Sequence, residues 1–193
     1  ATHLLHFALR QVLGDHVVQR GSLVTEDRTR FDFSHDSKID AATIASVENI
    51  VNDIVKNNTI TEIKNMKYSE AVDYGAVALF GEKYEDRVRV LKIGPSIELC
   101  GGTHVSRTGD IGFFKIISEG SVASGVRRIE AVSGKAAEEY VLSLERTLRK
   151  TSELLKVPHH KILDKVKQLN HDLMQRAKDI RLLKSEQIRT QKL

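Results

Sequence analysis

The sequence predicts an α+β fold in which an antiparallel or mixed sheet packs against helices and an α-helical hairpin follows. Strand-like stretches follow one another in the first 134 residues, and only two helical stretches interrupt them. This order is typical of α+β proteins and not of alternating α/β proteins. After Gly134 the sequence contains no glycine and keeps a helical pattern, which only Pro158 interrupts. We therefore divide the chain into residues 1–134 and a helical segment, residues 135–193.

The two helices of the first part are marked by their spacing and by their ends. In residues 3–13 apolar side chains recur three and four positions apart, and Gly14 follows as a residue that commonly ends a helix. The second helix begins after Asp40, whose carboxylate is a favoured N-cap. It continues with the same periodicity to the "KNN" of residues 56–58.

The predicted strands are short runs of β-branched and aromatic residues between polar turns or glycines. In the clearest of them, Phe31 and Phe33 alternate with Arg30 and Asp32. The full set of predicted strands comprises residues 17–24, 28–33, 77–80, 87–93, 111–117 and 126–132.

The segment after residue 134 is predicted to form two antiparallel helices, Lys135–Lys156 and His160–Leu193. Pro158 ends the first of them near Val157. In the second, apolar residues recur at alternating threes and fours, close to the period of a coiled coil. Only this helix has a clear apolar stripe, so the surface that covers the stripe belongs to a partner chain or to another domain. A homodimer through these helices is one such arrangement.

Composition narrows the class of protein. The 193 residues contain no apolar run long enough for a transmembrane helix. The single cysteine, Cys100, excludes an internal disulfide and is typical of the reducing cytoplasm. Residues 135–193 carry 14 Lys and Arg against 8 Asp and Glu, while residues 1–134 carry 16 against 18. The basic segment indicates either a polyanionic partner or a helix with a solvated basic face.

Cys100 stands in the stretch "ELCGGTHV", four positions before His104. The glycines between them allow a tight loop in which sulfur and imidazole face one point. From the spacing alone three interpretations stay open: a buried packing cysteine, one pair of zinc ligands, or a nucleophile with His104 as its base.

The remaining histidines carry weaker signals. His3 and His6 share the first helix at a spacing that could just bring both to one ion. For His6 we expect a position on the helix surface. The same expectation of a loop or a solvated helix applies to five others, His16, His35, His159, His160 and His171.

Several motifs together resemble the editing domain of alanyl-tRNA synthetase in their order, their spacing and the identity of their residues. The resemblance spans residues 1–134 and is carried by "ATHLLH" (1–6), "VVQRGSLV" (17–24), "RTRFDFSH" (28–35), "ALFGEKY" (78–84), "ELCGGTHV" (98–105), "TGDIGFFKIISE" (108–119) and "GVRRIEAVSG" (125–134). The later helices resemble the linker to that enzyme's C-terminal dimerisation domain. A more distant likeness to the threonyl-tRNA synthetase editing domain is implied.

The resemblance implies a zinc ion bound by a His-x3-His pair and a Cys-x3-His pair. Residue by residue, His3 corresponds to the second histidine of the first pair, and Cys100 and His104 to the other pair. The first histidine would lie two positions before Ala1. If that histidine is absent, we expect either loss of the zinc or its retention by three protein ligands and water. If it is present before Ala1, we expect the zinc affinity to survive.

The function that the resemblance implies is hydrolysis of tRNA(Ala) wrongly charged with serine or glycine, the tRNA being bound chiefly by its 3′ acceptor end. Such editing is needed because one methyl or hydroxyl group is too small a difference for a single binding step to reject. Nothing in the chain resembles the ATP-binding aminoacylation core of the full-length enzyme. The alternatives are a non-catalytic, zinc-stabilised fragment that binds tRNA or oligomerises, and a cysteine hydrolase.

The resemblance also assigns roles to individual residues. Thr2 and Gln19 fall where the family lines its amino-acid pocket, and Glu98 could orient a water molecule or a ligand. Together with Cys100 they form the expected catalytic group. The expected substrate-binding residues are the loop residues Gly101, Gly102 and Thr103 and two residues for tRNA phosphates, Arg127 and Arg128.

Overall fold

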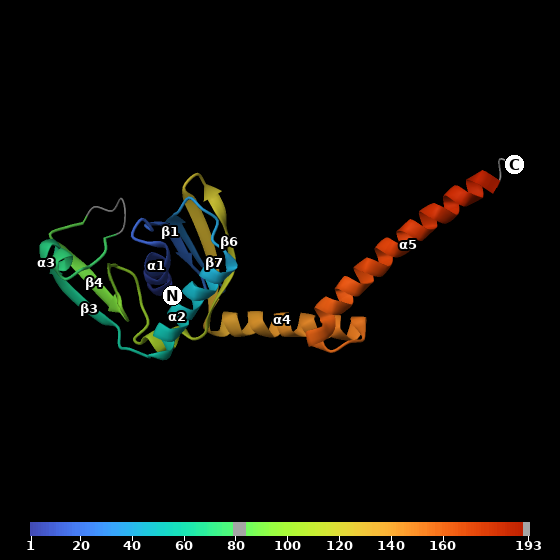
Figure 1. The fold of residues 1–193 in the computed structure, drawn as a ribbon. Coiled ribbons are helices and arrows are strands. Elements are labelled where there is room, and N and C mark those ends of the chain that lie inside the picture. Colours follow the sequence, from blue (N-terminus) through green and yellow to red (C-terminus); the bar gives the residue numbers. More distant parts are fainter. Residues whose placement is uncertain (79–83, 191–193) are drawn as a thin grey trace. The chain divides into compact units, whose positions relative to one another are not determined.

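The computed structural model describes residues 1–78 and 84–190 and confirms the α+β prediction (Figure 1). The chain divides into two units, Ala1–Tyr140 and Val141–Leu193. Both sheets lie in the first unit. Because the units divide inside a helix, the division into an editing domain and a helical linker at residue 134 stays a prediction.

The larger sheet forms the base of the main core. Its four strands pair antiparallel in the order β1 (Gln19–Val24), β2 (Thr29–Ser34), β7 (Val126–Ser133) and β6 (Phe114–Ala123). Alternation along β2 buries Phe31 and Phe33 completely on one face, where Ile129 of the paired β7 joins them. The predicted strand at 111–117 begins later than expected, because Thr108–Ile111 forms a short 3₁₀ turn, η1.

Two helices cover this buried face. α1 (Thr2–Leu13) ends at Gly14, which has a φ of 112°, as its sequence predicts. α2 (Ala41–Lys56) is N-capped by Asp40, whose side chain accepts a hydrogen bond from the Thr43 amide. α1 packs against α2 on one side and contacts the smaller sheet on another (Figure 1). The first turn of α1 is therefore surrounded by protein.

α2 is also fastened to the edge strand of the larger sheet. The Asn52 side chain accepts from the Phe114 amide and donates to the Phe114 carbonyl, both at 2.9 Å. One turn earlier, Glu48 accepts from the Ile116 amide at 2.6 Å. These bonds occupy backbone groups that an edge strand would otherwise leave unpaired.

The smaller sheet was only partly predicted. It consists of β3 (Glu62–Lys67), β4 (Arg87–Ile93) and β5 (Ser96–Leu99), all antiparallel, with the short helix α3 (Tyr68–Asp73) against β3 and β4. Only β4 was expected, and its bounds agree. β3 escaped prediction because it is an edge strand with exposed side chains and lacks a buried apolar alternation. Of the strand expected at 77–80, Val77 forms an isolated bridge to Glu98, and residues 79 and 80 lie outside the described residues.

The second unit contains most of the first predicted helix and the described part of the second. α4 (Gly134–Leu155) and α5 (Ile162–Thr190) are joined through a short turn, η2 (His159–Lys161). Within the described residues they do not pack side by side as the predicted hairpin, and the stripe residues Leu173 and Leu183 of α5 are 68% and 64% exposed. The expectation that only the second helix carries an apolar stripe is wrong, because Val141, Leu144 and Leu148 recur at helical spacing on α4 and are also exposed. None of the helices in the described part of the chain combines the length and apolar character of a membrane span.

Candidate metal centre

The first turn of α1 directs two histidines into the protein. His3 is 9% exposed and His6 only 2% exposed. The expectation that His6 lies on the helix surface is therefore wrong. Four consecutive residues of this turn are buried, because α1 has neighbours on several sides. A helix that is apolar nearly all round is typically buried in this way, and that signal was available in "HLLHFAL".

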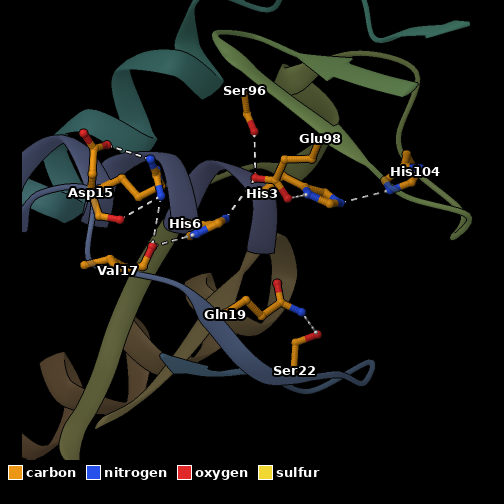
Figure 2. A network of polar contacts seen from close by, with 10 residues as sticks. His3, His6, Asp15, Val17, Gln19, Ser22, Ser96, Glu98 and His104 are labelled. Atoms are coloured by element: carbon orange, nitrogen blue, oxygen red, sulfur yellow. Dashed lines mark hydrogen bonds and ion pairs between the residues drawn. The ribbon is translucent and has the colours of Figure 1, made fainter. Parts of the chain in front are cut away.

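Both histidines meet one carboxylate from the smaller sheet. Glu98 of β5 accepts from His3 Nδ1 at 2.6 Å and from His6 Nδ1 at 3.1 Å (Figure 2). The Ser96 hydroxyl donates to the same carboxylate at 2.9 Å. Because Glu98 holds Nδ1 of His3, the other ring nitrogen of His3 points away from it, toward His104. A carboxylate that fixes a histidine in this manner is the usual outer partner of a metal ligand.

Three side chains converge beyond Glu98. The ligand atoms of His3, Cys100 and His104 all lie within 4.8 Å of one another. His3 Nε2 and His104 Nε2 are 3.2 Å apart, close to the edge of about 3.3 Å between two nitrogens around a tetrahedral zinc ion. Among the described residues this is the one group of three such side chains that could hold a metal ion.

The hydrogen bonding of His104 also fits a metal ligand. Its Nδ1 is buried without a hydrogen-bond partner in the described structure, and its Nε2 faces another imidazole instead of an acceptor oxygen. Two imidazoles and a thiol are a donor set that zinc prefers. The residues present therefore fit a zinc ion.

The protonation states follow from the same contacts. Burial alone would lower the pKa of His3, but its hydrogen bonds to Cys100 and Glu98 raise that pKa to about 9. Burial would likewise raise the pKa of Glu98, yet the bonds from His3 and His6 lower it to about 2. The hydrogen bond from His3, helped by the Gly102 amide, lowers the pKa of the Cys100 thiol. Burial and the nearby charges of His3 and Arg89 lower the pKa of His104 to about 4. The lowered pKa values of Cys100 and His104 favour the forms that bind metals, whereas His3 with its raised pKa must release a proton to bind one.

Comparison with known proteins shows which family of enzymes the chain is similar to. Residues 88–130 match the family model described as the threonyl and alanyl tRNA synthetase second additional domain, a range that includes the Cys100–His104 loop. The chain is 56% identical over 187 residues to the alanine–tRNA ligase of Xanthomonas campestris pv. campestris strain 8004, covering 96% of this chain and 21% of that protein. It is 54% identical over 190 residues to the alanine–tRNA ligase of Bordetella pertussis strain Tohama I, covering 98% and 21%. The chain is homologous to one segment of alanine–tRNA ligase. It spans about a fifth of the length of the curated ligases it matches.

The two residues expected to line an amino-acid pocket, Thr2 and Gln19, lie on α1 and β1. Thr2 directly precedes His3 in the first turn of α1 and is partly buried. Gln19 opens β1 and pairs with Phe33 in register, so it faces the same side of the sheet as the core. Its amide donates to the Ser22 hydroxyl at 3.2 Å (Figure 2). A pocket role for both residues stays a prediction.

The loop residues Gly101, Gly102 and Thr103 are exposed beside the metal ligands. A Cβ added at Gly102 would lie 3.7 Å from Cys100 Sγ and 3.9 Å from a carbon of the His104 ring. The loop therefore leaves space at its surface while its two ends turn inward. A substrate-binding role for these residues also stays a prediction.

The two arginines expected at tRNA phosphates lie on opposite faces of β7. Arg127 is 8% exposed, and its Nε donates to Glu119. Arg128 forms a two-fold hydrogen bond with Asp32 at 2.6 and 2.7 Å. Adjacent strand residues point to opposite faces, and each guanidinium has a carboxylate partner. A role of either arginine at tRNA phosphates stays a prediction.

In the described part of the chain, the other histidines do not belong to the group of side chains that could hold a metal ion. His159, His160 and His171 are exposed, as expected. His16 and His35 form a pair that the sequence did not indicate, with His16 Nε2 2.8 Å from His35 Nδ1. They are 19 residues apart in the chain and are brought together only by the folding of β1 onto β2.

Proposed function

We propose that this chain is the editing segment of an alanine–tRNA ligase and hydrolyses the ester of serine or glycine wrongly attached to tRNA(Ala). The observation that carries the proposal is the group of His3, Cys100 and His104, with Glu98 behind His3, in a chain homologous to these ligases. The match to a synthetase additional domain covers the loop with two of those three residues.

His3, Cys100 and His104 would hold a zinc ion, with a fourth position open to solvent, substrate or another ligand. When bound, zinc supplies a positive charge that polarises an oxygen or anchors the substrate's polar groups.

The protein's own groups prepare this site. Glu98 accepts the Nδ1 proton of His3 and fixes the ring, so that Nε2, once it has released its own proton, would be the atom that faces the metal. His6 and Ser96 hold Glu98 in turn. Thr2 and Gln19 supply a hydroxyl and an amide at positions where a serine hydroxyl would be recognised. Recognition of this hydroxyl would distinguish the seryl ester from the alanyl ester, which lacks it, but it would not account for hydrolysis of the glycyl ester.

The partner under this proposal is tRNA(Ala), bound by its 3′ end. Basic side chains of the helices after residue 134 would contribute non-specific affinity for its phosphates. ATP is not required for hydrolysis of the ester and would serve only the full-length ligase.

The test is deacylation of seryl-tRNA(Ala) by the chain, together with its zinc content. His104→Ala and Cys100→Ala should each lose bound zinc and lower the deacylation rate by about 100-fold or more. His171→Ala is the matched control, because it removes an exposed histidine outside the site. It should leave both quantities unchanged.

Three results would redirect the proposal. Zinc binding without deacylation would favour the non-catalytic, zinc-stabilised fragment. Deacylation that survives metal removal but not thiol alkylation would favour a cysteine hydrolase. Full activity of Cys100→Ala would exclude both the zinc assignment and the thiol nucleophile.

A further inference from the structure

The loop that carries two of the three metal ligands has little structure of its own. Residues 100–104 contain no helix or strand, and the three residues between Cys100 and His104 are exposed. A Cβ at Gly101 would meet nothing within 4 Å. Since glycines leave the chain free to adopt many conformations, such a loop does not hold its ligands in place without an external restraint.

Arg89 of β4 supplies that restraint. Its Nη1 donates to the Cys100 carbonyl at 2.5 Å and to the Gly102 carbonyl at 2.9 Å. These two carbonyls belong to the residues before and after Gly101. One guanidinium nitrogen therefore restrains the backbone on both sides of a glycine that has no neighbouring side chain or backbone within 4 Å of a Cβ. The Cys100 amide in turn donates to the Arg89 carbonyl at 3.1 Å. Arg89 is therefore bonded to the loop by both its main chain and its side chain.

The strand register explains why this residue can do so. Val90 of β4 pairs with Leu99 of β5, which places Arg89 opposite Cys100, just where β5 ends and the loop begins. The side chain then extends along the loop as far as Gly102. Arg89 thus forms hydrogen bonds with the chain beyond the end of β5, in a segment that has no strand structure of its own.

The guanidinium has no competing carboxylate in the described residues. The ion pairs found there include those of Arg127 and Arg128 but none of Arg89. A charged donor to a carbonyl makes a stronger hydrogen bond than a neutral donor does. The two hydrogen bonds of the Arg89 side chain to loop carbonyls therefore restrain the conformation of the loop.

We propose that Arg89 is a positioning residue of the metal centre, which holds the Cys100–His104 loop in its ligating shape before the metal binds. This inference rests on the proposed zinc site. In the absence of Arg89 the loop would have to be ordered at the moment of metal binding. That ordering would weaken the affinity, as is general when a binding site is not preorganised.

The experiment compares the apparent zinc affinity of four proteins by competition with a chromophoric chelator at fixed pH. They are the unaltered chain, Arg89→Met, Arg89→Lys and Arg87→Met. Arg89→Met should weaken zinc binding by about 10–100-fold, the usual effect of removing an outer partner of a metal site. Arg89→Lys keeps the charge but is one bond shorter, and should restore part of the affinity. Arg87→Met makes the same change two residues away, at an exposed position of β4, and should bind zinc like the unaltered chain.

Substitution of cobalt(II) for zinc gives a second readout that a merely structural role would not alter. The thiolate-to-cobalt absorption reports the contact between Cys100 and the metal directly. In Arg89→Met this band should be weaker or shifted at metal saturation, while Arg87→Met should give the unaltered spectrum. If Arg89→Met fails to fold by circular dichroism, Arg89→Lys decides, with an expected loss of about tenfold.

The outcomes separate this inference from the proposed function. If the unaltered chain binds zinc and both Arg89 variants match Arg87→Met in affinity and spectrum, Arg89 has no positioning role, while the metal centre stands. If the unaltered chain binds no zinc, the metal centre fails and the role of Arg89 fails with it.

Discussion

The two units of the chain are both rich in apolar residues at helical or strand spacing, but only one of them buries those residues. In Ala1–Tyr140, side chains such as Phe31, Phe33 and Phe114 are completely buried among residues distant in sequence. In Val141–Leu193, the leucines of α5 are mostly exposed among the described residues. The first unit is therefore stabilised by tertiary packing and the second by interactions within its helices.

Local interactions in the second unit fit this view. Arg149 pairs with Glu145 one turn earlier in α4, at 2.7 and 2.9 Å. Such pairs stabilise a helix by only about 0.2–0.5 kcal/mol each, whereas burial of one large apolar side chain contributes about 1.5–3 kcal/mol. A periodic apolar pattern therefore predicts a helix in either unit, but it does not predict how much tertiary packing stabilises that helix.

The largest expected effect tests this contrast directly. Phe31→Ala should lower the free energy of unfolding by about 3–5 kcal/mol, because it leaves a cavity in the core. Leu183→Ala, at an exposed position, should change it by less than about 0.5 kcal/mol. Denaturant unfolding can be followed by tyrosine fluorescence, since the chain has four tyrosines at positions 68, 74, 84 and 140, all in the first unit. Equal effects of the two variants would show that the units do not differ in this way.

A second prediction concerns the place where the first unit leads into α4. Gly112 has a φ of 68°, and a Cβ there would lie 2.8 Å from the Cα of Gly134, the first residue of α4. Gly112→Ala should therefore lower the free energy of unfolding by about 2–3 kcal/mol, through left-handed backbone strain and the clash. Gly120→Ala is the control, because a Cβ at Gly120 meets nothing within 4 Å. If both variants unfold alike, the close packing of Gly112 against Gly134 is not important for stability.

The same contrast explains what the sequence could and could not predict. β4 was predicted to its exact bounds because its residues carry a local apolar pattern, and Asp40 was predicted as a cap because its bond to Thr43 is local. β3 was missed because pairing with β4, and not its own side chains, makes it a strand.

The candidate site followed a similar rule. His3, Cys100 and His104 were named through a family resemblance, since nothing in the spacing alone joins α1 to a loop about 100 residues later. The roles of His6 and Arg89 depend on which elements surround α1 and where β5 ends, and these are properties of the folded chain. The periodicity of residues within one helix or strand therefore cannot predict these roles.

A smaller effect is expected where α2 meets the edge of the larger sheet. Asn52→Ala removes both hydrogen bonds to the Phe114 backbone and should cost about 1–2 kcal/mol of unfolding free energy. Asn65→Ala, on the exposed edge strand β3, should cost much less. Tyrosine fluorescence, which reports on the first unit, gives the unfolding midpoint of each variant. A midpoint unchanged from that of the unaltered chain would mean that water replaces the two bonds without loss.

The smallest effect on the first unit is expected from the strongest local change in the second. Met174→Pro, near the middle of α5, removes a backbone hydrogen bond and clashes with the preceding turn, which costs a helix about 3 kcal/mol. Circular dichroism at 222 nm should show loss of helix, while the tyrosine-monitored unfolding midpoint stays at that of Met174→Ala. This follows because Met174 is 70% exposed and lies in the unit that contains no tyrosine. A midpoint that falls together with the helical signal would show that the two units unfold as one, and that exposure of the α5 leucines does not make the helices independent of the core.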